Sequence, residues 1–257
     1  MIRGLCIDVA GVLTQGDCAL PGAIDALKRL QAAGLPFRLL TNTSRTPPNL
    51  LLHSLQEQGF SVKGPELITA PDAIRHQVIE SQLTPWYLVH PDIESLFPAT
   101  PRGAHYDTVV VCDAGEAFDY ARLNQAFSLL LQGARFLAIG RNRYFRDAHG
   151  LQLDAGPFIE ALHFASGRDP EWIGKPGPAL FQAASQSMSL PLEDLLMIGD
   201  DVGSDVLGAQ ALGMPSILVK TGKYQAGDET SRPDNAQTLA DFPAAVDALL
   251  KGLLKVN

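Results

Sequence analysis

The chain has 257 residues, of which 46% are hydrophobic, and it carries a formal net charge of −8 at pH 7. A chain of this length can bury one large core or two modest ones. The acidic balance disfavours nucleic acids and anionic membrane surfaces as partners, because both would be repelled. No stretch of the sequence approaches the roughly 18 apolar residues of a membrane-spanning helix, and the N-terminal apolar run is too short for a secretory signal.

The chain contains three cysteines, Cys6, Cys18 and Cys112. Their number is odd and none of them forms a C-x-x-C pair, so neither a disulfide framework nor a zinc site is predicted. This cysteine usage is typical of a reducing compartment, and we expect a cytoplasmic protein.

Strand-like and helix-like segments alternate along the first 70 residues and again near the C-terminus. Strands are predicted at residues 5–9, 36–42, 66–70, 194–200 and 215–220. Helices are predicted at residues 21–34, 47–59, 177–188 and 204–213. This alternation predicts an α/β fold, a Rossmann-like doubly wound parallel sheet with helices on both faces.

The middle of the chain has an α/β pattern of its own. Its strand-like segments are 86–90, 107–113 and 135–140, and its helix-like segments are 120–133 and 156–167. The sequence shows no internal repeat, and no low-complexity linker joins this section to its flanks. We therefore expect a core domain formed by residues 1–71 and 172–257, with residues 72–171 inserted as a second α/β domain.

Four polar elements fall beyond strands or before helices of the predicted core. They are Asp8, the pair Thr41 and Asn42, Lys175, and the acidic cluster of Asp200, Asp201 and Asp205. In open parallel sheets, ligands bind beyond the carboxyl ends of the strands, so these residues are expected to converge. Together they supply a carboxylate nucleophile, a hydroxyl group, a point cation and oxygen ligands for a hard divalent cation. Those groups are suited to phosphoryl transfer on a small phosphorylated substrate.

Each of these elements also has an ordinary structural explanation. Asp8 at a strand end can cap a helix or form a turn, and Thr41 and Asn42 are common turn residues. Lys175 can be a solvated surface lysine, and the segment GDDVGSD can be a solvated acidic loop that caps the next helix. The hypothesis of a catalytic site therefore depends on the elements occurring together.

In their order along the chain, the four elements resemble the motifs of the haloacid dehalogenase-like hydrolase superfamily. The matching stretches are CIDVAGVL, LLTNTS, the lysine of GKPGPALF, and IGDDVGSD. The inserted section resembles the C2 cap (group IIA) of that superfamily. RNRYFRDAHGLQLDAGPFIEALHFASG and VKTGKY resemble stretches of the phospholysine phosphohistidine inorganic pyrophosphate phosphatase branch. The resemblance covers nearly the whole chain.

The resemblance implies a Mg²⁺-dependent phosphatase in which Asp8 attacks phosphorus and forms an aspartyl-phosphate. It implies that Mg²⁺ is held by Asp8, Asp200 and the backbone carbonyl of Ala10, with Asp205 acting through water or as a further ligand. It assigns no role to Asp201. Because the resemblance is to members with C2 caps, we also expect that this protein can form a homodimer through its cap.

The resemblance also implies how the phosphoryl group is held. Thr41 and the backbone of Asn42 would bind its oxygens, and Lys175 would offset the negative charge on Asp8 and phosphate. In the inserted section, the basic and aromatic stretch GRNRYFRD offers Arg143 and Tyr144 as contacts for an anionic or ring-bearing substrate. The alternative is that this stretch is a solvated hairpin tip.

The sequence departs from the superfamily pattern at Ala10, where most of its phosphatases have an acid–base aspartate. Without that carboxylate we expect a preference for good leaving groups, as in phosphoramidates, pyrophosphate and aryl phosphates. The cap histidines His90 and His149 are further candidates for the missing acid.

The alternative function is a phosphoryl-binding or sensing protein with little turnover. A response-regulator receiver is disfavoured by the chain length, and carbon–halogen hydrolysis by the acidic cluster.

Overall fold

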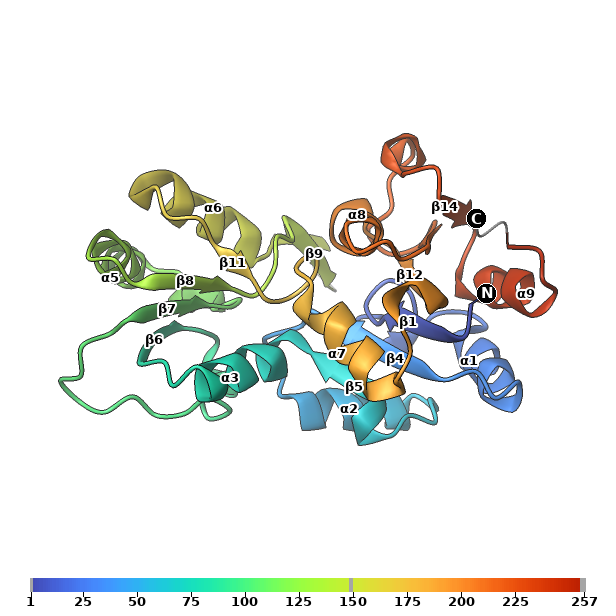
Figure 1. Cartoon of the computed structure of the whole chain (residues 1–257), viewed down its shortest axis with the longest axis horizontal. Coiled ribbons are helices and arrows are strands. Elements are labelled where there is room, and N and C mark those ends of the chain that lie inside the picture. The colour runs from blue at the N-terminus through green and yellow to red at the C-terminus, as the bar shows by residue number, and fades with distance from the viewer. Residues whose placement is uncertain (1, 148–149, 255–257) are drawn as a thin grey trace.

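The computed structural model describes residues 2–147 and 150–254, and its core is a six-stranded parallel sheet (Figure 1). The strands, in spatial order, are β14 (Ala236–Leu239), β13 (Ser216–Val219), β12 (Leu195–Gly199), β1 (Gly4–Asp8), β4 (Phe37–Thr41) and β5 (Leu67–Thr69). Strand β1 lies in the middle, hydrogen bonded to β12 on one side and β4 on the other. The predicted α/β fold with a parallel sheet is confirmed.

Helices cover both faces of this sheet, because successive side chains of a strand point to opposite faces. Leu5 and Ile7 of β1 belong to the buried cluster that includes the inner faces of α1 (Ala23–Ala32), α2 (Pro48–Glu57) and α9 (Phe242–Leu250). Cys6 belongs to a cluster on the other face, with α7 (Ala179–Met188). Strand β1 is buried throughout, as expected for a central parallel strand.

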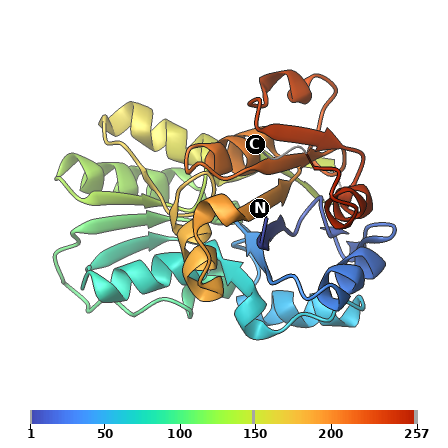
Figure 2. The same cartoon turned by 45° about the vertical axis from the view of Figure 1, so that its right-hand side comes forward.

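A second parallel sheet is formed by the middle of the chain. Its strands, in spatial order, are β11 (Glu171–Trp172), β8 (Arg135–Ala138), β7 (Thr108–Val111) and β6 (Pro85–Leu88). Its helices are α3 (Ala70–Glu80), α4 (Pro91–Glu94), α5 (Tyr120–Leu131) and α6 (Ala155–Ser166). In Figures 1 and 2 this sheet lies beside the core sheet and carries helices of its own.

We call the part of the chain built on this second sheet the cap. Helix α3 runs across the predicted boundary between residues 71 and 72, and Trp172 pairs with Ala138 in the second sheet. The exact division at 71/72 and 171/172 stays a prediction. A hairpin of β9 (Tyr144–Asp147) and β10 (Gly150–Leu153) extends from the cap toward the core (Figure 1).

Two local features differ from the predicted elements. The helix expected at 204–213 begins earlier, as a π-type turn over Val202–Val206, and continues as the short α8 (Leu207–Gln210). The tight turn folds Asp205 back against the end of β12, and a side chain at Gly199 would therefore overlap Asp205. A small hairpin of β2 (Thr14–Gln15) and β3 (Cys18–Ala19) follows β1 and was not predicted.

Among the helices of the described residues, none is both long and apolar enough to cross a membrane.

Candidate active site

Asp8 and Lys175 form the buried centre of the site. Asp8 is the last residue of β1, and Lys175 reaches it from the loop that leaves the cap. Lys175 Nζ donates hydrogen bonds of 2.7 Å to Asp8 Oδ1 and 2.7 Å to Asp205 Oδ1. Burial alone would lower the pKa of Lys175, but the facing carboxylates of Asp205 and Asp8 outweigh it and raise that pKa. Lys175 is therefore a buried ammonium group that joins two carboxylates.

Asp8, Asp200 and Asp205 each offer a carboxylate oxygen within 4.8 Å of the others. Asp200 Oδ1 is buried and has no hydrogen-bond partner, although the backbone N–H of Lys223 donates to Oδ2 at 2.7 Å. Burial, together with the charge of Asp8, raises the pKa of Asp200 well above its ordinary value. A buried acceptor without a donor is costly, and a hard cation would satisfy it.

The two oxygens of Asp205 are already engaged. Oδ1 accepts from Lys175, and Oδ2 accepts from the backbone N–H of Asp201 at 3.2 Å. Burial raises the pKa of Asp205 to about 7. Asp200 Oδ1, which has no hydrogen-bond partner, is therefore more open to a metal ion than either oxygen of Asp205, and the three carboxylates fit an oxygen-ligated divalent cation.

Two glycines make room for Asp200. Gly11 and Gly222 both have positive φ, +84° and +60°, and a methyl group built on either would overlap the carboxylate of Asp200. The backbones of the loops after β1 and β13 can thus approach this carboxylate closely, because glycine has no side chain at the point of contact. The Thr221 hydroxyl donates to the carbonyl of Gly11 and ties these two loops together.

Asp201 and Lys223 border the acidic cluster. Asp201 caps the turn at Val202–Val206, where its side chain accepts from the N–H groups of Gly203 at 2.8 Å and Ser204 at 3.1 Å. Lys223 Nζ lies 3.6 Å from Asp201 Oδ2. Although burial opposes it, Lys223 keeps the pKa of Asp201 below its ordinary value. The residue that had no predicted role is thus a helix cap and the partner of Lys223.

Thr41 and Asn42 lie at the end of β4, beside Asp8. Thr41 Oγ1 accepts from the N–H of Thr43 at 3.1 Å and donates to Thr43 Oγ1 at 2.9 Å. The Asn42 side chain accepts from the N–H of Lys175 at 2.9 Å and donates to its carbonyl at 2.7 Å. Asn42 therefore holds the backbone of Lys175 against β4, a contact that the sequence did not indicate.

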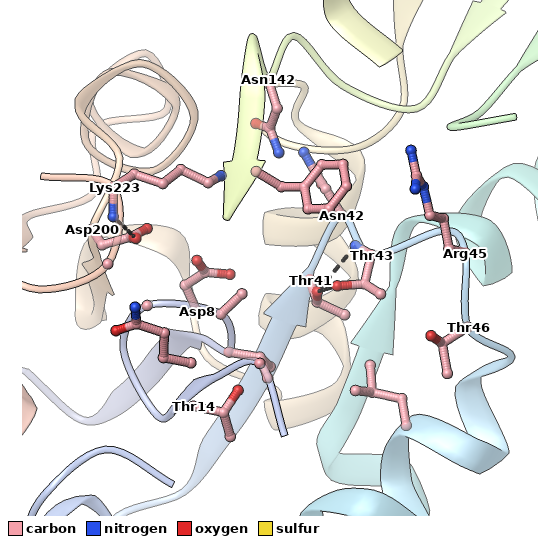
Figure 3. Close-up of a pocket in the computed structure, with 18 of the residues that line it drawn as sticks. Asp8, Thr14, Thr41, Asn42, Thr43, Arg45, Thr46, Asn142, Asp200 and Lys223 are labelled. Atoms are coloured by element: carbon pink, nitrogen blue, oxygen red, sulfur yellow. Dashed lines mark hydrogen bonds between the residues drawn. The ribbon is translucent and has the colours of Figure 1, made fainter. Parts of the chain in front are cut away.

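A cavity of about 460 Å³ lies between the core and the cap, and its lining includes Asp8, Thr41, Asn42, Lys175 and Asp200. That volume suits a small molecule. In Figure 3, Asp8, Thr41 and Asp200 face the cavity from the core, and the side chain of Asn142 comes down toward it from the cap. Asp113, Phe145 and Asp154 complete the cap side of the wall.

Arg45 connects the two sides of the cavity. It follows Thr41 and Asn42 in the loop after β4, and its guanidinium donates to both carboxylate oxygens of Asp113, at 2.6 Å and 3.0 Å. The same guanidinium lies 4.6 Å from the centre of the Phe145 ring. No sequence signal singled out Arg45, because its partners become neighbours only when the cap packs on the core.

Arg143 and Tyr144 lie in the wall of a second cavity, of about 930 Å³, which borders the turn at Val202–Val206. Arg143 stacks over the Tyr144 ring at 5.4 Å, and the Tyr144 hydroxyl accepts from Gln225 Nε2 at 2.8 Å. They do not line the cavity that contains Asp8. Contact of Arg143 and Tyr144 with a substrate stays a prediction.

Ala10 lines the catalytic cavity next to Asp8, with its side chain exposed. Of the two cap histidines, His90 caps α4, where its Nδ1 accepts from the N–H of Asp92 at 3.3 Å, and it does not line this cavity. His149 lies outside the described residues. The described part of the structure therefore offers no histidine that replaces an acid at position 10.

The chain is similar to known proteins along nearly its whole length. A family model described as haloacid dehalogenase-like hydrolase matches residues 5–97, and one described as HAD-hydrolase-like matches residues 172–244. Haloacid dehalogenase-like hydrolase domain-containing protein 2 from Bos taurus is 40% identical, with 98% of both chains covered. Phospholysine phosphohistidine inorganic pyrophosphate phosphatase from Homo sapiens is 36% identical over 97% of this chain and 95% of its own. Among solved structures, a 4-nitrophenylphosphatase from Thermotoga maritima shares the fold, with a TM-score of 0.86 at 24% identity, covering 96% of this chain and 97% of its own.

Proposed function

Because the chain belongs to the haloacid dehalogenase-like hydrolase family, we propose that it is a Mg²⁺-dependent phosphatase that works through an aspartyl-phosphate on Asp8. The family resemblance drawn from the motifs is confirmed. The observation that carries the proposal is the arrangement of Asp8 and Lys175 beside Asp200, whose Oδ1 is buried without a partner.

In the first step, a carboxylate oxygen of Asp8 forms a bond to phosphorus while the bond from phosphorus to the leaving group breaks. The leaving group takes that electron pair and a proton from solvent, because Ala10 has none to give. In the second step, water attacks phosphorus, which releases inorganic phosphate and restores the Asp8 carboxylate. Before the reaction Lys175 is held charged by the carboxylates of Asp8 and Asp205, and it would offset negative charge that builds up on the phosphoryl group.

Asp8, Asp200 and the backbone carbonyl of Ala10 are the proposed Mg²⁺ ligands, and Asp205 holds Lys175 in place. Among the described residues, Asp8, Asp200, Asp201 and Asp205 face two lysines, Lys175 and Lys223, which leaves two negative charges in excess when all four are ionised. A bound divalent cation would neutralise that excess and would supply Lewis-acid stabilisation of the phosphoryl group.

The proposed substrates are small phosphorylated molecules with good leaving groups: phosphoramidates, pyrophosphate and aryl phosphates. Ala10 supports this preference, because it has no proton to donate. The name of the 36% identical relative, which includes phospholysine, phosphohistidine and pyrophosphate, supports the same classes. We also propose a cytoplasmic location, supported by the free thiols of Cys6, Cys18 and Cys112. A cap-mediated homodimer stays a prediction.

Ala10 also favours the second candidate, a protein that binds phosphoryl groups with little turnover. A screen of purified protein with Mg²⁺ against phosphate monoesters, phosphoramidates and pyrophosphate separates the two. Steady release of inorganic phosphate supports the phosphatase. Binding of phosphate analogues without repeated release supports the binding protein.

A further inference from the structure

The catalytic cavity contains a cation whose hydrogen-bond donors are free. In the described part of the structure, the lysines and arginines that line this cavity are Arg45, Lys175 and Lys223. Lys175 Nζ donates to two carboxylates, and the guanidinium of Arg45 donates to another. None of the described residues accepts a hydrogen bond from Lys223 Nζ, and its ion-pair partner, Asp201 Oδ2, lies 3.6 Å away. Lys223 therefore has N–H donors to offer a ligand.

The side chain of Lys223 has open space beside it. It is 16% exposed, whereas the side chain of Lys175 is 3% exposed. Lys223 lines both the catalytic cavity and the second cavity, of about 930 Å³. In Figure 3 its side chain extends into the catalytic cavity on the side of Asp8 opposite to Thr41. A group bound to Lys223 Nζ would therefore lie apart from the proposed position of the phosphoryl group, which is beside Thr41.

The loop that carries Lys223 is held in place on both sides of this residue. The hydroxyl of Thr221 donates to the loop after β1, and the backbone N–H of Lys223 itself donates to Asp200 Oδ2 at 2.7 Å. Further along the loop, Gln225 Nε2 donates to the hydroxyl of Tyr144 in the cap at 2.8 Å. A substrate would thus meet a lysine on an ordered loop, which reduces the free-energy cost of ordering the site on binding.

Charge also favours a role for Lys223 in binding an anion. Burial alone would lower the pKa of Lys223, but the carboxylates of Asp200 and Asp201 outweigh it and raise that pKa, so the side chain is an ammonium group. Asp8 and the acidic cluster carry two more charges than Lys175 and Lys223 can balance, and a bound divalent cation would balance those two. The charge of Lys223 would then be available to an anionic group of the substrate.

We propose that Lys223 is a specificity-determining residue that binds a second anionic group of the substrate, next to the phosphoryl group that Asp8 attacks. This inference rests on the proposed phosphatase function and adds a specificity to it. Charge-assisted hydrogen bonds from Lys223 Nζ stabilise such a group, and a substrate without one gains nothing from them. Among the three proposed substrate classes, pyrophosphate is favoured most, because its leaving group is itself an anionic phosphate.

Binding of two matched phosphonates tests this contact without any bond being broken. Phosphonoacetate carries a carboxylate beside its phosphonate group, and carbamoylmethylphosphonate has a neutral amide of the same size in its place. In calorimetric titrations of the wild-type protein at saturating Mg²⁺, we expect Kd for phosphonoacetate to be lower by roughly tenfold or more, the scale of one hydrogen bond to a charged group. Equal affinities, or tighter binding of the amide, would overturn the proposal.

Variants of Lys223 locate the effect. Lys223→Met removes the charge from a side chain of similar length, and the ratio of the two Kd values is expected to fall to about one. Lys223→Arg keeps the charge and is expected to keep part of the preference. The matched control is Lys220→Met, because Lys220 lies in the same loop, 3.7 Å from Glu229, and lines neither cavity. Thermal unfolding of each variant checks the fold.

Turnover separates this contact from the proposed function. In Lys223→Met, kcat/KM for pyrophosphate is expected to fall roughly tenfold or more relative to kcat/KM for 4-nitrophenyl phosphate. If Lys223 only pairs with Asp201, its loss would affect both phosphonates alike and both substrates alike, which would overturn the contact and leave the phosphatase standing. Absence of phosphate release from both substrates, with the phosphonate preference lost in Lys223→Met, would overturn the phosphatase and support the contact.

Discussion

At the scale of single residues, we expect the methyl group of Ala10 to limit the chemistry of the proposed active site. It is exposed beside Asp8, where an acid–base group would act, and no histidine of the described residues lines the cavity to replace it. General acid–base groups contribute on the order of 10²- to 10⁴-fold to rate. The enzyme should therefore be slow on alkyl phosphates, whose leaving oxygen needs a proton.

Ala10→Asp is expected to raise kcat on an alkyl phosphate by roughly tenfold or more, and to raise it less on an aryl phosphate or a phosphoramidate. The measurement compares both proteins on the three substrates at saturating Mg²⁺. Gln15→Asp, which places a carboxylate elsewhere on the cavity rim, is the control for added charge. An equal effect of Ala10→Asp on all substrates would mean that proton donation at this position does not limit turnover.

At the scale of elements, the site depends on loops that follow β1, β4, β12 and β13 at one edge of the core sheet. The sequence predicted that Asp8, Thr41, Lys175 and Asp200 would converge, because carboxyl ends of parallel strands share an edge. It did not show the strand order, and the convergence needs β1 to lie between β4 and β12. The strand order depends on packing between segments that are far apart along the chain, and local sequence patterns do not reveal such packing.

The residues that the sequence missed lie on loops between elements. Asn142, Asp154 and Asp113 come from the cap, and they reach the cavity only because the cap lies over the core. Lys223 lies in the stretch VKTGKY, which had been noted only as a resemblance. Its backbone contact with Asp200 depends on the positive φ of Gly222, which no hydrophobic pattern reveals.

Gly222→Ala tests whether these loops position Asp200. At φ +60° the new methyl group would overlap the Asp200 carboxylate, so we expect Mg²⁺ affinity to fall by roughly tenfold or more and phosphate release to fall with it. Gly213→Ala is the matched control, because Gly213 also has a positive φ, of +74°, but no atom within 4 Å of the added methyl position. Both variants carry backbone strain of roughly 1 kcal/mol. Equal Mg²⁺ affinity in the two variants would contradict the proposed placement of Asp200 by Gly222.

At the scale of the whole molecule, the buried acidic cluster should couple folding to pH and to Mg²⁺. Burial raises the pKa of Asp205 to about 7 and raises that of Asp200 as well. An unfolded aspartate loses its proton near pH ~4. Between about pH 4 and pH 7 the folded state thus binds more protons than the unfolded state, so this cluster makes the metal-free protein less stable as pH rises.

In EDTA, the contribution of this cluster is therefore expected to lower the melting temperature between about pH 5 and pH 7, and Mg²⁺ is expected to restore it. At a Mg²⁺ concentration about 100 times Kd, the rise at pH 7 should be roughly 5 °C or more. Asp200→Asn should raise the melting temperature in EDTA, by removing a buried charge, and should abolish the response to Mg²⁺. Asp25→Asn, at an exposed position of α1, is the control for loss of a surface charge. A metal response that survives Asp200→Asn would remove Asp200 from the metal site.

The most direct test of the proposed mechanism is phosphate release by Asp8→Asn in Mg²⁺, measured beside the wild-type protein on 4-nitrophenyl phosphate and phosphoramidate. The amide has the size of the carboxylate but is a poor nucleophile, so release should fall by roughly 10⁴-fold or more, the scale of losing a covalent nucleophile. Circular dichroism and thermal unfolding check that the variant stays folded. If folded Asp8→Asn kept more than a small fraction of wild-type release, Asp8 would not be the nucleophile and the proposed mechanism would be wrong.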